Sequence, residues 1–179
     1  MAKAELRLTG SGGQGVILAT VILAEAAFLD HRHVAQSQSY GPEARGGMCK
    51  AEVIIDNNPI TYTKVQEPTF LLALTQPSLE KYGTNLPEEA VIMADSSLEV
   101  PEQLKKQHQV YQVPILDTAV NKVGRAMTAN IVAVGAINAV LHLASRESLR
   151  KGVAMHIPKG TEEMNMKALD EGLRLVAQN

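Results

Sequence analysis

Residues 5–19 read ELRLTGSGGQGVILA, and this stretch decides the fold. Apolar and polar residues alternate over 5–9, four glycines fall within 10–15, and an apolar run begins at Val16. That order predicts a strand, a tight turn and the start of a helix. Glycine permits positive φ and a close backbone approach, and a helix N-terminus carries partial positive charge. The turn is therefore a candidate site for an anion such as a phosphate.

Gly10, Gly12 and Gly15 have the G-x-G-x-x-G spacing of dinucleotide-binding turns. Such a site also needs a carboxylate about 20 residues further on, at the end of the second strand, to hold a ribose hydroxyl. The expected second strand, 33–39, contains no Asp or Glu. The pattern therefore favours another phosphate-bearing ligand over NAD or a flavin dinucleotide. A purely structural turn is the remaining alternative.

Length and composition limit the classes of protein that the chain can represent. With 179 residues, 45% of them hydrophobic, we expect one domain spanning 1–179. A net charge of −2, four Tyr, two Phe and no Trp argue against nucleic-acid binding. The most apolar segment, 129–143, is too short and too polar to span a membrane. A lone cysteine, Cys49, cannot form an internal disulfide, and no secretory signal is evident, so we expect a reducing, cytoplasmic location.

Alternating strand and helix patterns follow the glycine turn. The expected strands are 33–39, 50–56, 60–62, 70–74, 91–94 and 110–113, with 60–62 forming a hairpin with 50–56. Short helices are expected at 77–82 and 102–107, and Asp117, Thr128 and Thr161 are candidate caps of three later helices. The pattern predicts a single-domain α/β fold. Its mixed, mostly parallel sheet is covered by helices on both faces and has a Rossmann-like glycine turn after the first strand.

A second motif, QSQSYGPEARGG, occupies residues 36–47. Burying so many hydroxyl, amide and guanidinium groups is costly unless each finds a partner. The loop is therefore expected to contact a ligand or another subunit. The alternative is a solvated loop in which Glu43 and Arg45 are ordinary surface charges.

The two motifs together resemble one family. GSGGQG at 10–15, followed by SYGPEARGG at 39–47, is similar to the gamma subunit of the 2-oxoacid:ferredoxin oxidoreductases. The similarity continues through 121–125, Asn130, Gly135 and the tail at 158–165, and so covers nearly the whole chain. The segment 36–47 is most similar to the 2-oxoglutarate branch, with the pyruvate and 2-ketoisovalerate branches as alternatives.

The resemblance implies a subunit of an enzyme complex that oxidatively decarboxylates a 2-oxoacid, passes electrons to ferredoxin and releases an acyl-coenzyme A. It places thiamine diphosphate, Mg and the iron–sulfur clusters on partner chains, namely alpha, beta and a ferredoxin-like delta subunit. This chain contains no Gly-Asp-Gly motif for thiamine diphosphate, and one cysteine cannot ligate a four-iron cluster. We therefore expect the isolated chain to be inactive. Its seven methionines and several helices that are apolar on all sides also predict a partner interface, through which the isolated chain forms a homodimer or aggregates.

Coenzyme A is the ligand whose chemistry suits the two motifs, because its phosphates need backbone N–H groups, a helix N-terminus and guanidinium groups. The expected coenzyme A contacts are Gly12, Gly13, Gln14, Gly15, Arg45, Arg125, Thr128 and Asn130. Tyr40, Gly41, Pro42 and Glu43 are expected at the active-site rim or against a partner chain. We expect no catalytic residue and no metal site. The alternatives are a non-catalytic assembly subunit, of this complex or of an indolepyruvate or pyruvate oxidoreductase, and a free-standing nucleotide-binding enzyme.

Overall fold

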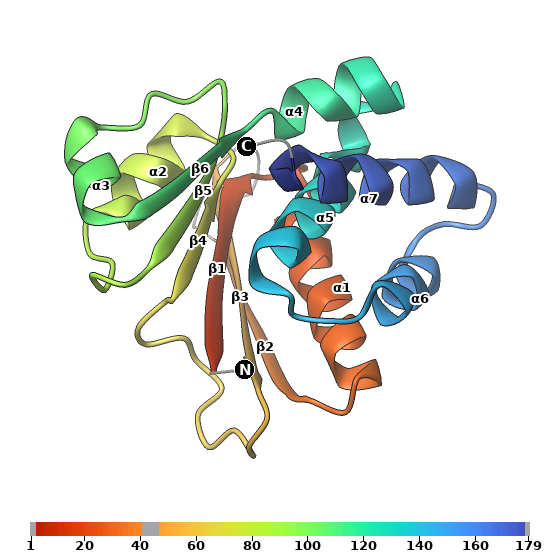
Figure 1. Cartoon of the computed structure of the whole chain (residues 1–179), viewed down its shortest axis with the longest axis horizontal. Helices are drawn as coiled ribbons and strands as arrows, with labels where there is room; N and C mark the ends of the chain where they lie inside the picture. Colours follow the sequence, from red (N-terminus) through yellow and green to blue (C-terminus); the bar gives the residue numbers. More distant parts are fainter. Residues whose placement is uncertain (1–2, 41–46, 178–179) are drawn as a thin grey trace.

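The computed structural model describes residues 3–40 and 47–177, which form an α/β fold around one six-stranded sheet (Figure 1). The strands are β1 (Ala4–Ser11), β2 (His33–Tyr40), β3 (Met48–Asp56), β4 (Phe70–Ala73), β5 (Val91–Asp95) and β6 (Gln109–Val113). Their order across the sheet is β2-β3-β1-β4-β5-β6. The β1, β4, β5 and β6 strands are parallel, whereas β3 is antiparallel to both β1 and β2. The predicted mixed, mostly parallel sheet is confirmed.

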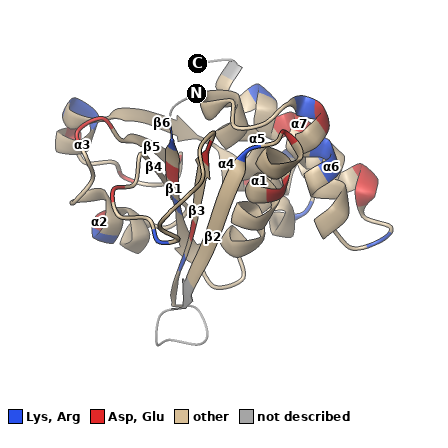
Figure 2. Ribbon diagram, turned by 90° about the horizontal axis from the view of Figure 1, so that it is seen from below, with Lys and Arg blue, Asp and Glu red and all other residues tan. Residues whose placement is uncertain are grey.

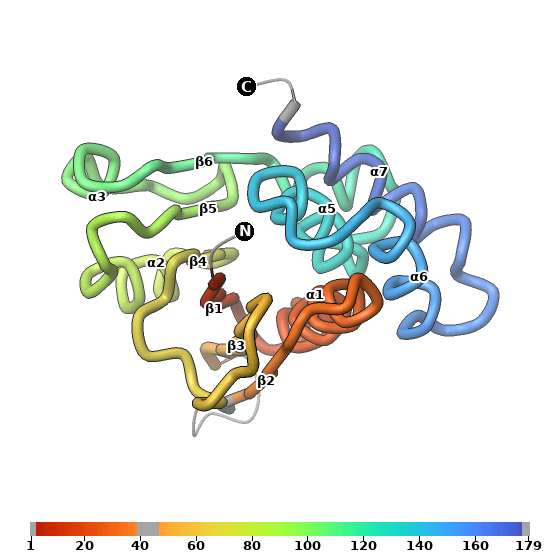
Figure 3. Tube along the Cα trace, turned by 60° about the horizontal axis from the view of Figure 1, so that its bottom comes forward, coloured from red at the N-terminus to blue at the C-terminus, as the bar shows by residue number. Residues whose placement is uncertain are grey.

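Helices cover both faces of this sheet (Figure 1). One face carries α1 (Val16–Leu29), α5 (Ala129–Leu141), α6 (Arg146–His156) and α7 (Glu162–Ala177). The other carries α2 (Gln76–Gly83) and α3 (Glu102–Gln107), which pack on β4 and β5. Between β6 and α5 the chain forms the short α4 (Ile115–Asp117), a π-helical turn η1 (Thr118–Val123) and a 3₁₀ turn η2 (Ala126–Thr128). Figure 3 shows α1 beside α6, and α5 beside α7.

The hairpin predicted between 50–56 and 60–62 is wrong. Residues 60–62 form no strand, and β3 pairs instead with β2, which precedes it, and with β1. Both edges of β3 are therefore occupied, and a further strand would have no backbone groups to pair with. The 57–69 segment instead crosses to β4, where the carboxylate of Glu5 accepts hydrogen bonds from the backbone N–H groups of Gln66 (3.0 Å) and Glu67 (3.4 Å).

Two of the predicted helix caps are also wrong. Asp117 lies inside the helical segment that begins at Ile115, and its carboxylate accepts from the side chain of Asn121 at 2.6 Å. Thr128 does precede α5, but its hydroxyl donates to the carbonyl of Arg125 at 2.7 Å. No backbone N–H group of α5 donates to this hydroxyl, as a capping side chain requires. The start of α5 therefore has no side-chain cap.

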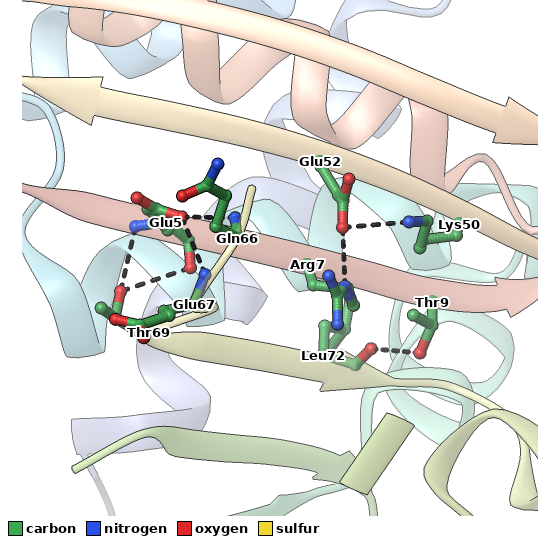
Figure 4. A network of polar contacts seen from close by, with 9 residues as sticks. All are labelled: Glu5, Arg7, Thr9, Lys50, Glu52, Gln66, Glu67, Thr69 and Leu72. Carbon is green, nitrogen blue, oxygen red and sulfur yellow. Dashed lines mark hydrogen bonds and ion pairs between the residues drawn. The ribbon is translucent and has the colours of Figure 1, made fainter. Parts of the chain in front are cut away.

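A polar cluster lies on the face of β1 opposite α1, because successive side chains of a strand alternate between faces (Figure 4). Glu52 of β3 accepts from Arg7 Nε at 2.7 Å and from Lys50 Nζ at 3.2 Å. The guanidinium of Arg7 also lies 5.6 Å from the ring centre of Tyr82 on α2. Only 8% of the Glu52 side chain and 17% of the Arg7 side chain are exposed, so this ion pair is largely removed from water.

Asp30 connects the end of α1 to the start of α6 through hydrogen bonds. Its carboxylate accepts from the backbone N–H and hydroxyl of Ser145 and from the hydroxyl of Ser148. Burial raises the pKa of Asp30, but these hydrogen bonds outweigh it, led by the one from the Ser145 backbone, and the pKa is lowered overall. The charged carboxylate is thus the form that stabilises the contact between the two helices.

The pH dependence of stability should reveal this contact. Asp30→Asn is expected to lower the unfolding free energy at pH 7 by about 1 kcal/mol, because a charge-assisted hydrogen bond is lost at a site still reached by solvent. A lowered folded-state pKa gives stability that is present above the usual carboxyl pKa and disappears as pH falls through the lowered value. The difference between wild type and variant should therefore shrink below about pH 4, and urea unfolding at pH 7 and pH 3 would measure it. A difference that stays constant between the two pH values would contradict this role.

Candidate functional site

The glycine turn joins β1 to α1 and is held from within by Gln14. The side-chain oxygen of Gln14 accepts from the backbone N–H of Ser11 at 2.7 Å, and the N–H of Gln14 donates to the carbonyl of Ser11 at 3.2 Å. Gly13 and Gly15 have φ values of 94° and 72°, which side chains rarely adopt. The side chain of Gln14 therefore shapes the turn, while Gly13 and Gly15 leave its backbone bare.

Gly15 also allows α1 to start directly against α5. A Cβ atom at Gly15 would lie 2.7 Å from Nδ2 and 2.9 Å from Cγ of Asn130, closer than packed atoms approach. A side chain at Gly15 would therefore displace the side chain of Asn130 from its present position. The left-handed backbone and this contact together explain why glycine stands at the N-cap position of α1.

A groove of about 310 Å³ opens at this contact. It is bounded by the N-terminal ends of three helices that are distant in sequence, α1, α5 and α7. Its lining residues are Gly13, Gly15, Leu18, Arg125, Met127, Thr128, Asn130, Ile131, Ile157, Pro158, Thr161, Met164 and Asn165. Most of the lining is apolar, with a few polar groups set among hydrophobic side chains, as is usual in sites for small organic ligands.

The charge distribution around the groove favours an anion. Neither α1 nor α5 has an acidic residue in its first turn, so each directs a positive dipole end at the groove. The α1 helix also presents uncapped N–H groups, whereas the N–H groups of Thr128, Ala129 and Ile131 at the start of α5 already have acceptors. Arg125 is exposed, and no ion pair joins it to any described carboxylate. The α7 helix differs, because its first turn carries Glu162 and Glu163. The pKa of Glu162 is lowered by hydrogen bonds from backbone N–H groups, including its own. The anion-binding character therefore comes from α1, α5 and Arg125.

The structure brings five of the eight expected coenzyme A contacts around this groove: Gly13, Gly15, Arg125, Thr128 and Asn130. Gly12 lies beside it, and its N–H donates to the carbonyl of Gly47 at 3.1 Å. Gln14 does not line the groove. Whether any of these residues binds coenzyme A stays a prediction.

Half of the second motif, residues 41–46, lies outside the described residues. This applies to Gly41, Pro42, Glu43 and Arg45, and Tyr40 is described only as the last residue of β2. The strands on either side do adjoin the glycine turn, because Cys49 of β3 pairs with both Gly10 and Tyr40. The glycine turn and the end of β2, which leads into the rest of the second motif, therefore lie at the same end of the sheet.

The local sequence does not predict the contribution of residues 157–165 to the groove. This segment supplies Ile157, Pro158, Thr161, Met164 and Asn165, which form one wall of the groove. Only the similarity of the 158–165 tail to the family pointed to it, because nothing local in the sequence shows that the start of α7 lies against the glycine turn.

Among the described residues, no helix combines the length and the hydropathy needed to cross a bilayer.

Comparison with known proteins agrees with this architecture. Residues 5–175 match the family described as pyruvate ferredoxin/flavodoxin oxidoreductase. The chain is 39% identical over 176 residues to the 2-oxoglutarate synthase subunit KorC of Methanocaldococcus jannaschii, covering 97% of this chain and 94% of that protein.

Two solved structures are similar over nearly the whole chain. The gamma subunit of a keto/oxoacid ferredoxin oxidoreductase from Geobacter sulfurreducens is 40% identical, with a TM-score of 0.86 and coverage of 99% of this chain and 98% of that one. A 2-oxoglutarate:ferredoxin oxidoreductase from Magnetococcus marinus, solved with 2-oxoglutarate, coenzyme A and succinyl-CoA bound, has a TM-score of 0.89 at 17% identity. The match covers all of this chain and 32% of that one, and shows the shared fold alone. The family predicted from the two motifs is confirmed: the chain belongs to the pyruvate ferredoxin/flavodoxin oxidoreductase family and resembles its gamma-type subunits throughout.

Proposed function

We propose that this chain is the gamma-type subunit of a cytoplasmic 2-oxoglutarate:ferredoxin oxidoreductase, and that its own share of the reaction is to bind coenzyme A. Similarity to a 2-oxoglutarate synthase subunit supports the choice of 2-oxoacid. The pyruvate and 2-ketoisovalerate enzymes are the alternatives. In this complex, thiamine diphosphate with Mg and the iron–sulfur clusters belong to alpha, beta and delta partner chains, from which electrons reach ferredoxin. The residues of this chain bind and orient the acyl acceptor.

The observation that carries the proposal is the convergence of α1, α5 and Arg125 on one groove. The phosphates of coenzyme A are anions of the kind that unpaired helix N–H groups and a guanidinium stabilise. No ribose-binding carboxylate is needed, in agreement with the absence of Asp and Glu from 33–39. Arg45 is proposed as a second phosphate contact, on the strength of the sequence motif alone.

The assembled complex carrying Arg125→Ala tests this role. The KM for coenzyme A is expected to rise about tenfold or more, because a charge-assisted hydrogen bond contributes roughly 1.5–3 kcal/mol. The KM for the 2-oxoacid should stay within about twofold of wild type, since only the acyl acceptor loses a contact. Steady-state kinetics with each substrate varied in turn would measure both constants. Arg45→Ala should behave in the same way.

Arg174→Ala is the matched control, because Arg174 is an exposed arginine on α7 that does not line the groove. It should leave both KM values unchanged. An Arg125→Ala complex with an unaltered KM for coenzyme A would count against the proposal.

A docking role is the second candidate function, favoured by exposed apolar side chains near Arg125. Met127 is 80% exposed and Val120 is 51% exposed, and both are among the few large hydrophobic side chains exposed in the described part of the chain. The same arginine variants separate the two roles. Loss of assembly on gel filtration, in place of a raised KM, would indicate that this surface holds a partner chain.

A further inference from the structure

Two buried asparagines line the groove from different helices, Asn130 on α5 and Asn165 on α7. They are 5% and 7% exposed, so each is a polar side chain largely withdrawn from solvent. Buried amide groups are costly unless they form hydrogen bonds. Each asparagine satisfies one half of its amide within the protein, and the other half has no hydrogen-bond partner among the described residues.

The hydrogen bonds within the protein show which amide atom of each asparagine has no partner. The Oδ1 atom of Asn130 accepts from the N–H of Ile131 at 3.0 Å, so its other amide atom is the Nδ2 donor, which lies against Gly15. No acceptor for this Nδ2 occurs in the described part of the chain. The Nδ2 atom of Asn165 donates to the carbonyl and the hydroxyl of Thr161, both at 2.9 Å, which leaves Oδ1 as an unused acceptor.

An unused donor and an unused acceptor complement a secondary amide, whose carbonyl accepts and whose N–H donates. Between them the lining is apolar, including Leu18, Ile131 and Met164. None of the described lining residues is aromatic, so they provide no stacking surface for a base. The groove therefore suits a flexible chain of methylene groups interrupted by amides.

We propose that this groove binds the pantetheine arm of coenzyme A, with Asn130 donating to an amide carbonyl of the arm and Asn165 accepting from an amide N–H. The inference rests on the proposed function and makes it specific. Arg125 contacts the phosphates at the nucleotide end, while the two asparagines form hydrogen bonds with the amides of the pantetheine arm. Recognition of the two halves of coenzyme A is thus divided between different residues of one groove.

Competition with the two halves of coenzyme A tests this division in the assembled complex. Pantetheine and adenosine 3′,5′-bisphosphate serve as separate inhibitors, and the inhibition constant of each is measured against coenzyme A. Asn130→Ala and Asn165→Ala should each weaken pantetheine about tenfold, since a buried partner is lost, and leave the bisphosphate within about twofold. Arg125→Ala should do the reverse.

Asn138→Ala is the matched control for Asn130→Ala. Asn138 lies on the same helix and is 6% exposed, but both halves of its amide bond to Ala144, away from the groove. It should leave the inhibition constant of pantetheine unchanged. If Asn130→Ala does not assemble, Asn165→Ala alone carries the test.

The outcomes distinguish the two proposals. If Arg125→Ala raises the KM for coenzyme A but neither groove asparagine affects pantetheine, the arm lies elsewhere and only this inference fails. Failure of pantetheine to compete in the wild-type complex would overturn it in the same way. If none of the variants, Arg125→Ala included, alters the KM for coenzyme A, the proposed function itself fails.

Discussion

Gly172→Ala is expected to lower the unfolding free energy by about 3 kcal/mol, because α5 and α7 cross with almost no space between their backbones. A Cβ atom on Gly172 would lie 2.1 Å from the carbonyl oxygen of Val132, and one on Gly135 would lie 2.4 Å from that of Leu169. These contacts involve helix backbone, which cannot rotate away as a side chain can. The helices would have to separate, and the walls that they give the groove would separate with them.

Thermal unfolding of the purified chain would measure this loss as a decrease in Tm of about 6–12 °C for a domain of this size. Alanine normally stabilises a helix relative to glycine by roughly 1 kcal/mol, so the expected effect has the opposite sign to intrinsic helix propensity. Gly124→Ala is the control, since Gly124 has a φ of 93° and no atom near its Cβ position. This variant should lower the unfolding free energy by only about 1 kcal/mol, because alanine is strained in a left-handed backbone conformation. A Gly172→Ala chain as stable as wild type would refute the close crossing.

Glu52→Ala is expected to cost about 2–3 kcal/mol of unfolding free energy, the second-largest effect among these predictions. Its carboxylate holds Arg7 and Lys50 on the sheet face shown in Figure 4, at 2.7 Å and 3.2 Å. Removing it leaves the guanidinium of Arg7, 17% exposed, without a counter-charge. The exposed part of Arg7 keeps the expected cost at the lower end of the range for buried pairs. Urea unfolding at constant pH would measure it.

A double variant separates the cost of an unpaired charge from the value of the pair. Arg7→Leu combined with Glu52→Leu removes both charges, and most of the lost stability should return, since a buried ion pair gains little over apolar packing. The coupling energy then follows from the cycle of single and double variants. A double variant as unstable as the sum of the two single variants would show that the residues do not interact.

The surface charges follow a simpler pattern, which the sequence predicts without the fold. Figure 2 shows Lys, Arg, Asp and Glu on the outer helices α3, α6 and α7, while the edge strand β2 carries none of them. Charged residues recur at helical spacing along α6 and α7, so the exposed sides of these helices can be predicted from the sequence.

The α6 helix itself was nevertheless not included among the expected elements. Its start, where the hydroxyl of Ser145 accepts from the N–H of Ser148, is a serine cap that precedes a mostly polar segment with few apolar residues.

The sequence by itself determined the structural features that depend only on residues close together along the chain. The β1 strand, the glycine turn and α1 follow one another within 30 residues, and the family is evident from two contiguous motifs. The buried β4 and β5 strands were predicted because short apolar runs need no knowledge of their partners. Five groove residues were also expected together, since the resemblance had already marked their positions.

Only the tertiary structure decided which distant segments meet. Local patterns cannot show that both edges of β3 are occupied, that Asn165 faces the groove beside Asn130, or that Gly172 lies on the backbone of Val132. Each depends on packing between separate segments of the chain, where steric fit and the pairing of buried polar groups select the partner. The turn that opens the sequence thus predicts the kind of ligand, whereas the helices that close the chain shape the groove in which we propose it binds.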